Sequence, residues 1–249
     1  MAFDWRRWLK SSPRPTTGAG LSVFSAGTMA VIFAVLGYLR QNHIQIPPNT
    51  LPWEPVNLNA PAGWIAHWQL NRLSADGQLC RTALGATTER IALLKDRKID
   101  GACGFENVVR VDSSQVTFAP RTTATCGLTA ALLWYQRALQ ETAQSQMHSQ
   151  LVRVDQVGTF ACRNVNSEAV GSRSQHATAN AIDVSAFHFA DGRVATIIRD
   201  YGKDSPEGHF LDAAHNAACP LFNTVLGPHY NRFHASHFHL DMGPYSICR

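Results

Sequence analysis

Residues 182–198 read Ile-Asp-Val-Ser-Ala-Phe-His-Phe-Ala-Asp-Gly-Arg-Val-Ala-Thr-Ile-Ile, a pattern typical of a β-hairpin. β-Forming residues run from Ile182 to Phe189 and again from Arg193 to Ile198, and Asp191-Gly192 between them suits a type I′ turn. A final strand is predicted at His237 to Asp241, where apolar and polar residues alternate. The last third of the chain is therefore expected to supply antiparallel strands.

Helical patterns dominate the region before this hairpin. Apolar residues recur at spacings of three and four in residues 62–73, 79–95 and 128–147, and a short helix is expected at 210–218. Residues 108–118 alternate like a strand. Helices followed by antiparallel strands predict an α+β domain, in which helices flank a small antiparallel sheet.

The N-terminal region predicts a membrane anchor. Residues 21–39 are uncharged and mostly apolar, and as a helix they would be about 28 Å long, close to the hydrocarbon thickness of a bilayer. The excess of basic residues before this span places the short segment 1–20 in the cytoplasm and exports the rest of the chain. These basic residues are Arg6, Arg7, Lys10 and Arg14.

A cleaved signal peptide is the competing interpretation of this region. Such a peptide needs a shorter apolar run and a small-residue cleavage site, whereas this segment ends in Gly37-Tyr38-Leu39-Arg40. Proline-rich residues 40–55 predict an extended tether after the anchor. Residues 56–249 are then long enough for one domain with a well-buried core.

The chain has six cysteines, all of them after the predicted anchor. No two form a Cys-x-x-Cys pair, so a structural zinc cluster of cysteines is not indicated. An even number of cysteines in an exported domain predicts disulfide bonds, whose pairing the sequence leaves open. The cysteines are Cys80, Cys103, Cys126, Cys162, Cys219 and Cys248.

Composition excludes some classes of protein and directs attention to histidine. A hydrophobic content of 45% excludes intrinsic disorder. The net charge of +4 is small, and the chain lacks a basic stripe interleaved with aromatic residues, which argues against a nucleic-acid partner. Histidine occurs 11 times, and most of these residues lie in the last third of the sequence.

Two histidine-rich patterns predict a metal site. His176 precedes Asp183 by seven residues, and His237 and His239 share one face of the predicted final strand with Asp241. If the hairpin pairs with this strand, imidazoles and a carboxylate converge, and this donor set suits zinc. Spacing alone does not choose between His237 and His239 as the ligand.

Several segments of the chain resemble a known family. His-x₆-Asp followed by His-x-His is similar to the zinc peptidases of the LAS group, which includes lysostaphin-type endopeptidases and D-Ala-D-Ala carboxypeptidases. The region from about Trp53 to the C-terminus resembles, more closely, the bacterial extensin-like C-terminal domain family. The matching segments are Phe160-Ala-Cys-Arg163, Ser174-Gln-His-Ala177, Asn180-Ala-Ile-Asp-Val184, Asp191-Gly-Arg193, Thr224-Val-Leu-Gly-Pro228, His237-Phe-His-Leu-Asp241 and Ile247-Cys-Arg249. Ala179 stands where the peptidase motif has glycine, and Gln175 where the extensin-like family usually has glutamate.

The resemblance implies a zinc ion bound by His176, Asp183 and His239. His237 is then expected to act as a general base or to stabilise the transition state beside a zinc-activated water. Arg163 is expected to stabilise the developing oxyanion, and His234 to orient groups or transfer a proton.

These expectations describe a single-pass protein of the bacterial inner membrane with its C-terminal domain in the periplasm. The expected activity is zinc-dependent hydrolysis of peptide bonds in peptidoglycan stem peptides, as a D,D-carboxypeptidase or an endopeptidase. The alternative is a cell-wall-binding or structural module that keeps the peptidase-like fold without turnover. The combined presence of the three ligands with His237 and Arg163 favours an enzyme, because a binding module has no chemical need for all five.

Overall fold

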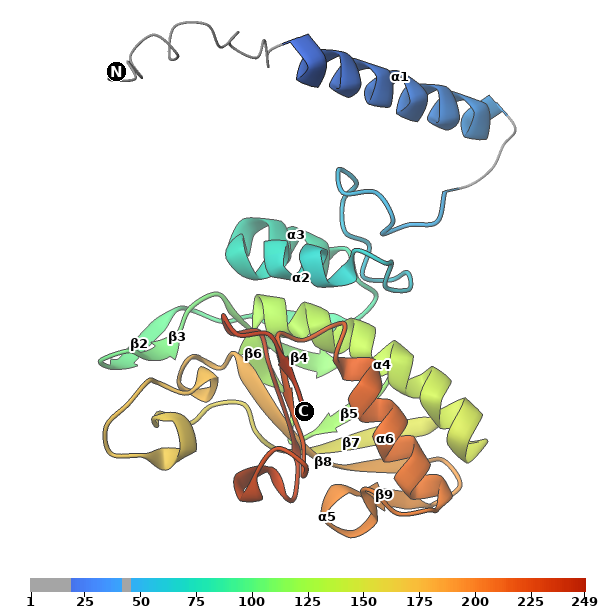
Figure 1. The fold of residues 1–249 in the computed structure, drawn as a ribbon. Coiled ribbons are helices and arrows are strands. Elements are labelled where there is room, and N and C mark those ends of the chain that lie inside the picture. Colours follow the sequence, from blue (N-terminus) through green and yellow to red (C-terminus); the bar gives the residue numbers. More distant parts are fainter. Residues whose placement is uncertain (1–18, 42–45) are drawn as a thin grey trace, which may run out of the picture. The chain divides into compact units, whose positions relative to one another are not determined.

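The computed structural model describes residues 19–41 and 46–249, and the chain divides into two compact units at Pro47–Pro48. The first unit contains helix α1 (Ala19–Gln41), and the helix predicted at residues 21–39 lies within it (Figure 1). None of the helices formed by the described residues combines the length and the apolar character needed to cross a membrane. The anchor stays a prediction. The basic segment 1–18 and residues 42–45 of the predicted tether lie outside the described residues.

The second unit is built on a seven-stranded sheet with the order β12-β10-β11-β8-β7-β5, in which β9 also pairs with β8. Its strands are β5 (Thr117–Ala119), β7 (Leu151–Gly158), β8 (Ala181–Phe189), β9 (Val194–Thr196), β10 (Thr224–Leu226), β11 (Phe238–Asp241) and β12 (Ile247–Cys248). β5 runs parallel to β7, and β12 parallel to β10, while the other pairs are antiparallel. The α+β class is confirmed, but the prediction of a small antiparallel sheet is wrong, because short parallel strands are added at both edges.

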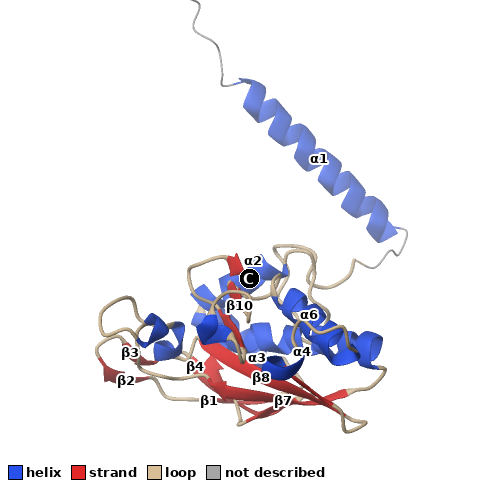
Figure 2. Ribbon diagram, turned by 60° about the horizontal axis from the view of Figure 1, so that its bottom comes forward, coloured by secondary structure: helices blue, strands red, loops and turns tan. Residues whose placement is uncertain are grey.

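Five helices and two smaller sheets complete this unit, and Figure 2 shows the helices gathered above the main sheet. The helices are α2 (Ala66–Ala75), α3 (Gly77–Gly85), α4 (Cys126–Met147), α5 (Ile197–Asp200) and α6 (Pro206–Ala218). The smaller sheets are formed by β1 (Arg90–Leu93), β4 (Val108–Ser113) and β6 (Thr123–Thr125), and by β2 (Arg97–Asp100) with β3 (Cys103–Phe105).

The helices begin where side chains accept hydrogen bonds from the first free amides. The Asp76 carboxylate accepts from the amides of Gln78 and Leu79 at the start of α3, at 3.0 and 2.9 Å. The Ser205 hydroxyl accepts from the amide of Gly208 at 3.1 Å, and Pro206 occupies the first turn of α6. Such caps satisfy amides that have no partner within the helix.

Helix α4 is the centre of the hydrophobic core. Most of its residues are buried, and it packs against α2, α3 and α6. The buried hydroxyl of Tyr135 donates a hydrogen bond to the carbonyl of Ala214 in α6, at 3.1 Å. Trp134 donates its indole N–H to the carbonyl of Ala60 at 3.0 Å, which attaches the segment before α2 to the core.

Three predicted elements differ from the structure. The helix predicted at 79–95 ends at Gly85, and its second half forms β1 instead. The strand predicted at 108–118 divides into β4 and β5, and the second strand of the hairpin ends at Thr196, where α5 follows. Apolar spacing over so few residues fits a helix, a strand or a break equally well, which explains these errors.

The hairpin β8–β9 is confirmed, but its predicted type I′ turn is wrong. That turn requires positive φ at both central residues, and of Asp191 and Gly192 only Gly192 has it, at 88°. The amide of Gly192 donates to the carbonyl of Phe189, and the amide of Phe189 to the carbonyl of Arg193. Three residues therefore form the loop, with glycine in the left-handed position that such loops require.

The six cysteines form three disulfide bonds, which confirms the prediction and supplies the pairing. Cys80–Cys126 joins α3 to the start of α4. Cys103–Cys162 joins β3 to the loop after β7, and Cys219–Cys248 joins the end of α6 to β12.

Gly127 and Gly85 form a matched pair of helical glycines that tests the packing of α2 against α4. A Cβ at Gly127 would lie 2.8 Å from the Cα of Ser74, whereas a Cβ at Gly85 would meet no atom within 4 Å. We expect Gly127→Ala to lower the free energy of unfolding by about 1–3 kcal/mol through overpacking. Gly85→Ala should leave it unchanged or raise it by up to about 1 kcal/mol, because alanine favours helix. Urea denaturation measures both, and equal stabilisation by the two substitutions would contradict the close approach of α2 and α4.

Candidate metal centre

Two strands in the interior of the main sheet place an imidazole opposite a carboxylate. β8 and β11 pair antiparallel, with His239 directly across from Asp183 and Phe238 across from Val184. Successive side chains of a strand point to opposite faces, so Phe238 and Leu240 enter the core while His239 lies on the other face. The predicted pairing of the hairpin with the final strand is thus present in the structure.

A short turn of 3₁₀ helix brings the second imidazole to this pair. The helix η3 (Gln175–Thr178) lies just before β8, and its first free amide, that of His176, donates to the hydroxyl of Ser174 at 3.3 Å. The turn ends at Ala179, whose φ of 56° is left-handed. This reversal of the chain lets His176 lie against β8 rather than point away from it.

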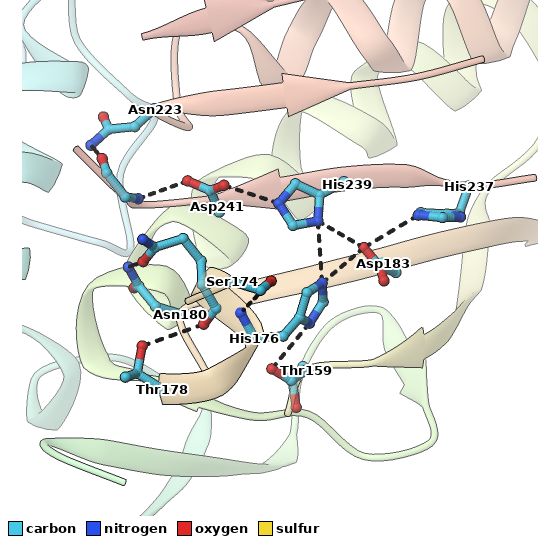
Figure 3. Close-up of polar contacts among 12 residues, drawn as sticks. Thr159, Ser174, His176, Thr178, Asn180, Asp183, Asn223, His237, His239 and Asp241 are labelled. Carbon is cyan, nitrogen blue, oxygen red and sulfur yellow. Dashed lines mark hydrogen bonds and ion pairs between the residues drawn. The ribbon is translucent and has the colours of Figure 1, made fainter. Parts of the chain in front are cut away.

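Three donor atoms converge at the centre of this arrangement (Figure 3). His239 Nδ1 lies 2.9 Å from Asp183 Oδ1, His176 Nε2 lies 3.1 Å from the same oxygen, and the two nitrogens are 3.2 Å apart. Ligands at zinc bond lengths of about 2.0–2.2 Å in a tetrahedron are separated by about 3.3 Å. The three atoms therefore have nearly the spacing that one face of a zinc tetrahedron requires.

The outer nitrogen of each ring has a hydrogen-bond partner that accepts. His176 Nδ1 lies 3.3 Å from the carbonyl oxygen of Thr159, which has no proton to give. His239 Nε2 lies 2.9 Å from Asp241 Oδ2, and the other oxygen of Asp241 accepts from the amide of Gly243 at 2.7 Å. Each outer nitrogen therefore carries the proton of a neutral ring, which leaves His176 Nε2 and His239 Nδ1 as lone pairs.

Two nitrogen lone pairs and a carboxylate oxygen thus face one another in a buried place. His176 is 2% exposed, and Asp183 and His239 are 9% exposed. Three acceptors at such distances repel unless a proton or a metal ion lies among them. The donor set also matches zinc in type, since imidazole and carboxylate are common zinc ligands. The residues present therefore fit a zinc ion with three protein ligands.

The pKa shifts of His239 and Asp183 also indicate that a positive charge is stabilised among these residues. Burial alone would lower the pKa of His239, but its hydrogen bonds with Asp183 and Asp241 outweigh burial and raise that pKa to about 9. Burial would raise the pKa of Asp183, but hydrogen bonds with His176 and His239 hold it well below its usual range. In the absence of a metal ion, the cluster retains a proton instead.

His237 and His234 lie beside the three donor atoms. His237 Nε2 is 3.5 Å from Asp183 Oδ1, and the ring of His234 lies 5.4 Å from that of His237 and 5.8 Å from that of His239. Burial lowers the pKa of His237, and burial with the nearby His239 lowers that of His234 to about 4. Both shifts favour the neutral form of the ring.

A cavity of about 880 Å³ opens onto this cluster. Arg163, His234, His237 and His239 line it, so the structure brings all the predicted catalytic residues to one place. The positive charge of Arg163 also contributes to the lowered pKa of His234 and His237. The lining includes further residues that the sequence did not single out: Arg173, Tyr230, Phe233 and Tyr245.

The remaining late histidines have partners elsewhere in the domain. His188 lies 2.7 Å from Asp155, and His209 lies 3.0 Å from Asp204. His215 lies within reach of Cys219 and Cys248, but a disulfide bond joins these two cysteines, so the three residues do not form a metal site. Among the described residues, His176, Asp183 and His239 form the one remaining group with metal-ligand geometry.

The sequence did not predict the hydrogen-bond partner of His176, but it did place the partner of His239 on the correct strand face. Thr159 immediately precedes the matching segment Phe160–Arg163, but it contacts His176 through its backbone carbonyl oxygen, and a pattern of side chains does not predict a backbone contact. Asp241 shared a predicted strand face with His239, and the strand alternation was the signal that placed it there.

Comparison with known proteins gives the family of this chain. The model of the family described as "Extensin-like protein C-terminus" matches residues 78–249. No curated protein and no solved structure matches the chain. The matched region includes every residue of the metal centre, from Thr159 to Asp241. Because this match covers more than half of the sequence, the chain belongs to the extensin-like protein C-terminus family.

Proposed function

We propose that this protein is a zinc-dependent hydrolase of peptide bonds in peptidoglycan stem peptides. The observation that carries the proposal is the convergence of two imidazole lone pairs and one carboxylate oxygen, each held by a second hydrogen bond or by strand pairing. Three protein ligands with a remaining open position are typical of catalytic zinc, whereas structural sites are closed by a fourth protein ligand. Similarity to LAS-type peptidases supports the reaction class.

His176, Asp183 and His239 would hold the metal. When bound, zinc acts as a Lewis acid that polarises a carbonyl group and lowers the pKa of water to about 7. Thr159 and Asp241 fix the orientation of the two imidazoles, as partners of metal-bound histidines usually do. The chain itself therefore supplies both the ligands and the groups that orient them.

The other polar residues of the cavity fit roles in proton transfer and charge stabilisation. His237 is neutral and faces the ligand cluster, so it is placed to take a proton from the attacking nucleophile. His234 donates its Nδ1 proton to the side-chain oxygen of Asn231 at 2.8 Å, which leaves Nε2 free to exchange a proton. Arg163 supplies positive charge for the oxyanion that develops on the substrate carbonyl.

The proposed location is the periplasmic side of the bacterial inner membrane, with the segment 21–39, predicted from the sequence, as the anchor. Three disulfide bonds are typical of proteins in oxidising compartments, and the periplasm is such a compartment. The basic residues before α1 favour a cytoplasmic N-terminus. Peptidoglycan lies on the same side as the domain in this arrangement.

Zinc analysis of the full-length protein tests the metal centre directly. After loading with zinc and dialysis, we expect about one zinc ion per chain, measured by mass spectrometry of the metal. Asp183→Ala should lower the occupancy at least about tenfold, because it removes a ligand and leaves two facing lone pairs. His209→Ala is the matched control, since His209 is an exposed histidine paired with Asp204. Wild-type protein that binds no zinc would overturn the proposal.

Asp241→Asn tests the orientation of His239. The asparagine side chain keeps the volume of aspartate but has no charge, so it accepts the imidazole proton less strongly. We expect zinc affinity to fall about 10–100-fold while every metal ligand is retained. Competition with a fluorescent zinc chelator measures this affinity, and Asp204→Asn at the exposed pair serves as the control. Equal affinities in the two variants would show that Asp241 has no part in the site.

Hydrolysis of purified muropeptides by the zinc-loaded protein tests the activity. Mass spectrometry is expected to show loss of a terminal D-alanine or cleavage of a cross-link. His237→Ala should keep its zinc but slow the reaction about 10²–10⁴-fold, since it removes a group that transfers a proton. His209→Ala should react at the wild-type rate. Muropeptides that stay intact with zinc-loaded wild-type protein would instead favour a wall-binding module.

A further inference from the structure

A second cavity, of about 550 Å³, lies next to the metal centre and has a different chemical character. Its lining contains no Asp, Glu, Lys or Arg, whereas the cavity at the metal centre contains Arg163, Arg173 and Asp241. Its volume lies in the range of pockets that bind small ligands. We call it the amide cavity, after the four side-chain amides in its lining: Asn71, Gln175, Asn180 and Asn223.

The four amides are held in fixed orientations by hydrogen bonds. Asn223 Nδ2 donates to Asn71 Oδ1 at 2.9 Å and to the carbonyl of Gly243 at 2.6 Å. Asn180 Nδ2 donates to Gln175 Oε1 at 2.8 Å, and Asn180 Oδ1 accepts from the hydroxyl of Thr125 at 2.7 Å. These bonds leave the Gln175 amino group directed away from Asn180 and available as a donor. Polar groups fixed in this way lose little entropy when a ligand binds.

Aromatic side chains accompany the amides. Tyr245 lines the cavity and is 62% exposed. Trp68 is 45% exposed, and it lies one helical turn from Asn71 on α2, with the Arg72 guanidinium 4.8 Å from the centre of its ring. The exposed ring of Tyr245 next to neutral donors and acceptors suits a ligand with both apolar faces and many uncharged polar groups. Sugars have this combination, whereas, among the described residues of the lining, the imidazole of His67 is the one titratable group besides the Tyr245 phenol.

The amide cavity and the cavity of the metal centre share three lining residues, Gln175, Pro244 and Tyr245. Figure 3 shows Asn180 and Asn223 at the Asp241 end of the ligand cluster, opposite His237. A cavity at this end is therefore a direct continuation of the reaction site. A substrate that joins a peptide to a sugar would reach both cavities at once.

We propose that the amide cavity binds the β-1,4-linked, N-acetylated sugar chain to which the stem peptide is attached. The choice of this sugar rests on the proposed function, while the chemistry of the cavity supplies the preference for an uncharged polar ligand. The Gln175 amino group is free to donate, and each amide oxygen has a second lone pair that can accept, so the cavity matches the amide of an acetamido group as well as hydroxyl groups. This binding requires no metal ion.

Calorimetric titration of the full-length protein with tetra-N-acetylchitotetraose tests this proposal. We expect saturable binding with similar affinity before and after removal of zinc. Asn71→Ala and Tyr245→Ala should each weaken binding about tenfold, through loss of a fixed amide and of an aromatic surface. Phe233→Ala is the matched control, because Phe233 is an exposed aromatic residue that lines only the cavity of the metal centre. Thermal unfolding establishes that each variant is folded.

Cellotetraose, which has hydroxyl groups in place of the acetamido groups, should bind at least about tenfold more weakly. Three outcomes would overturn the proposal: equal affinity for the two sugars, no binding of either sugar, or a loss of sugar affinity in Phe233→Ala alone. Failure of the proposed function is a separate result. Sugar binding without hydrolysis of muropeptides would contradict the proposed hydrolase and indicate a wall-binding site. Hydrolysis without sugar binding would support the hydrolase and contradict the sugar-binding role of the amide cavity. If both hold, disaccharide-linked peptides should be cleaved faster than free stem peptides, and Asn71→Ala should remove this difference.

Discussion

The contact between His239 and Asp183 across β8 and β11 is the interaction on which the candidate metal centre depends. It joins residues 56 positions apart in the sequence, and strand pairing sets their separation. His176 then approaches the same carboxylate oxygen from the preceding turn. Because both imidazoles have accepting partners on their outer nitrogens, the inner faces of all three residues are electron-rich. Burial makes that arrangement costly without a positive charge. The pairing of two strands thus brings together buried electron-rich atoms, whose mutual repulsion is relieved when a proton or a cation binds among them.

The position of these strands within the sheet explains how such precision is maintained. β8 has β7 along one edge and β11 and β9 along the other, and β11 lies between β8 and β10. Interior strands are hydrogen-bonded along both edges, so their side chains shift less than those of loops. Other residues that surround the cavity, Arg163 and Tyr245 among them, come instead from loops, and two disulfide bonds restrain the neighbouring chain. Cys103–Cys162 lies next to Arg163, and Cys219–Cys248 holds the last strand against α6. A rigid centre and tethered loops fit the hydrolytic site that we propose.

The parts of the fold that the sequence predicted correctly are those with a long or strictly alternating pattern. Helix α4, the hairpin β8–β9 and strand β11 were expected, and with them the face shared by His239 and Asp241. The errors lie in short elements such as β1, whose four residues have no pattern distinct from a helix end. The carbonyl of Thr159 and the aromatic lining of the cavity were not predictable, because they depend on how loops pack rather than on the order of residues. Ligand positions follow from periodicity, whereas the shape of a pocket follows from tertiary packing.

Ala179 occupies a backbone conformation that usually favours glycine. Its φ of 56° is left-handed, and this conformation costs an alanine about 1–2 kcal/mol. The surrounding hydrogen bonds impose the conformation nonetheless. The Ala179 amide donates to the carbonyl of His176 at 3.1 Å, and the Ala179 carbonyl accepts from the amide of Thr125 at 2.9 Å. Ala179 is also fully buried, so its methyl group gains packing that glycine would lack. Strain of this kind persists where neighbouring contacts over-determine the backbone. The turn that carries His176 is therefore set by its contact with β6 as much as by its own sequence, and His176 keeps its place although no glycine stands at the end of the turn.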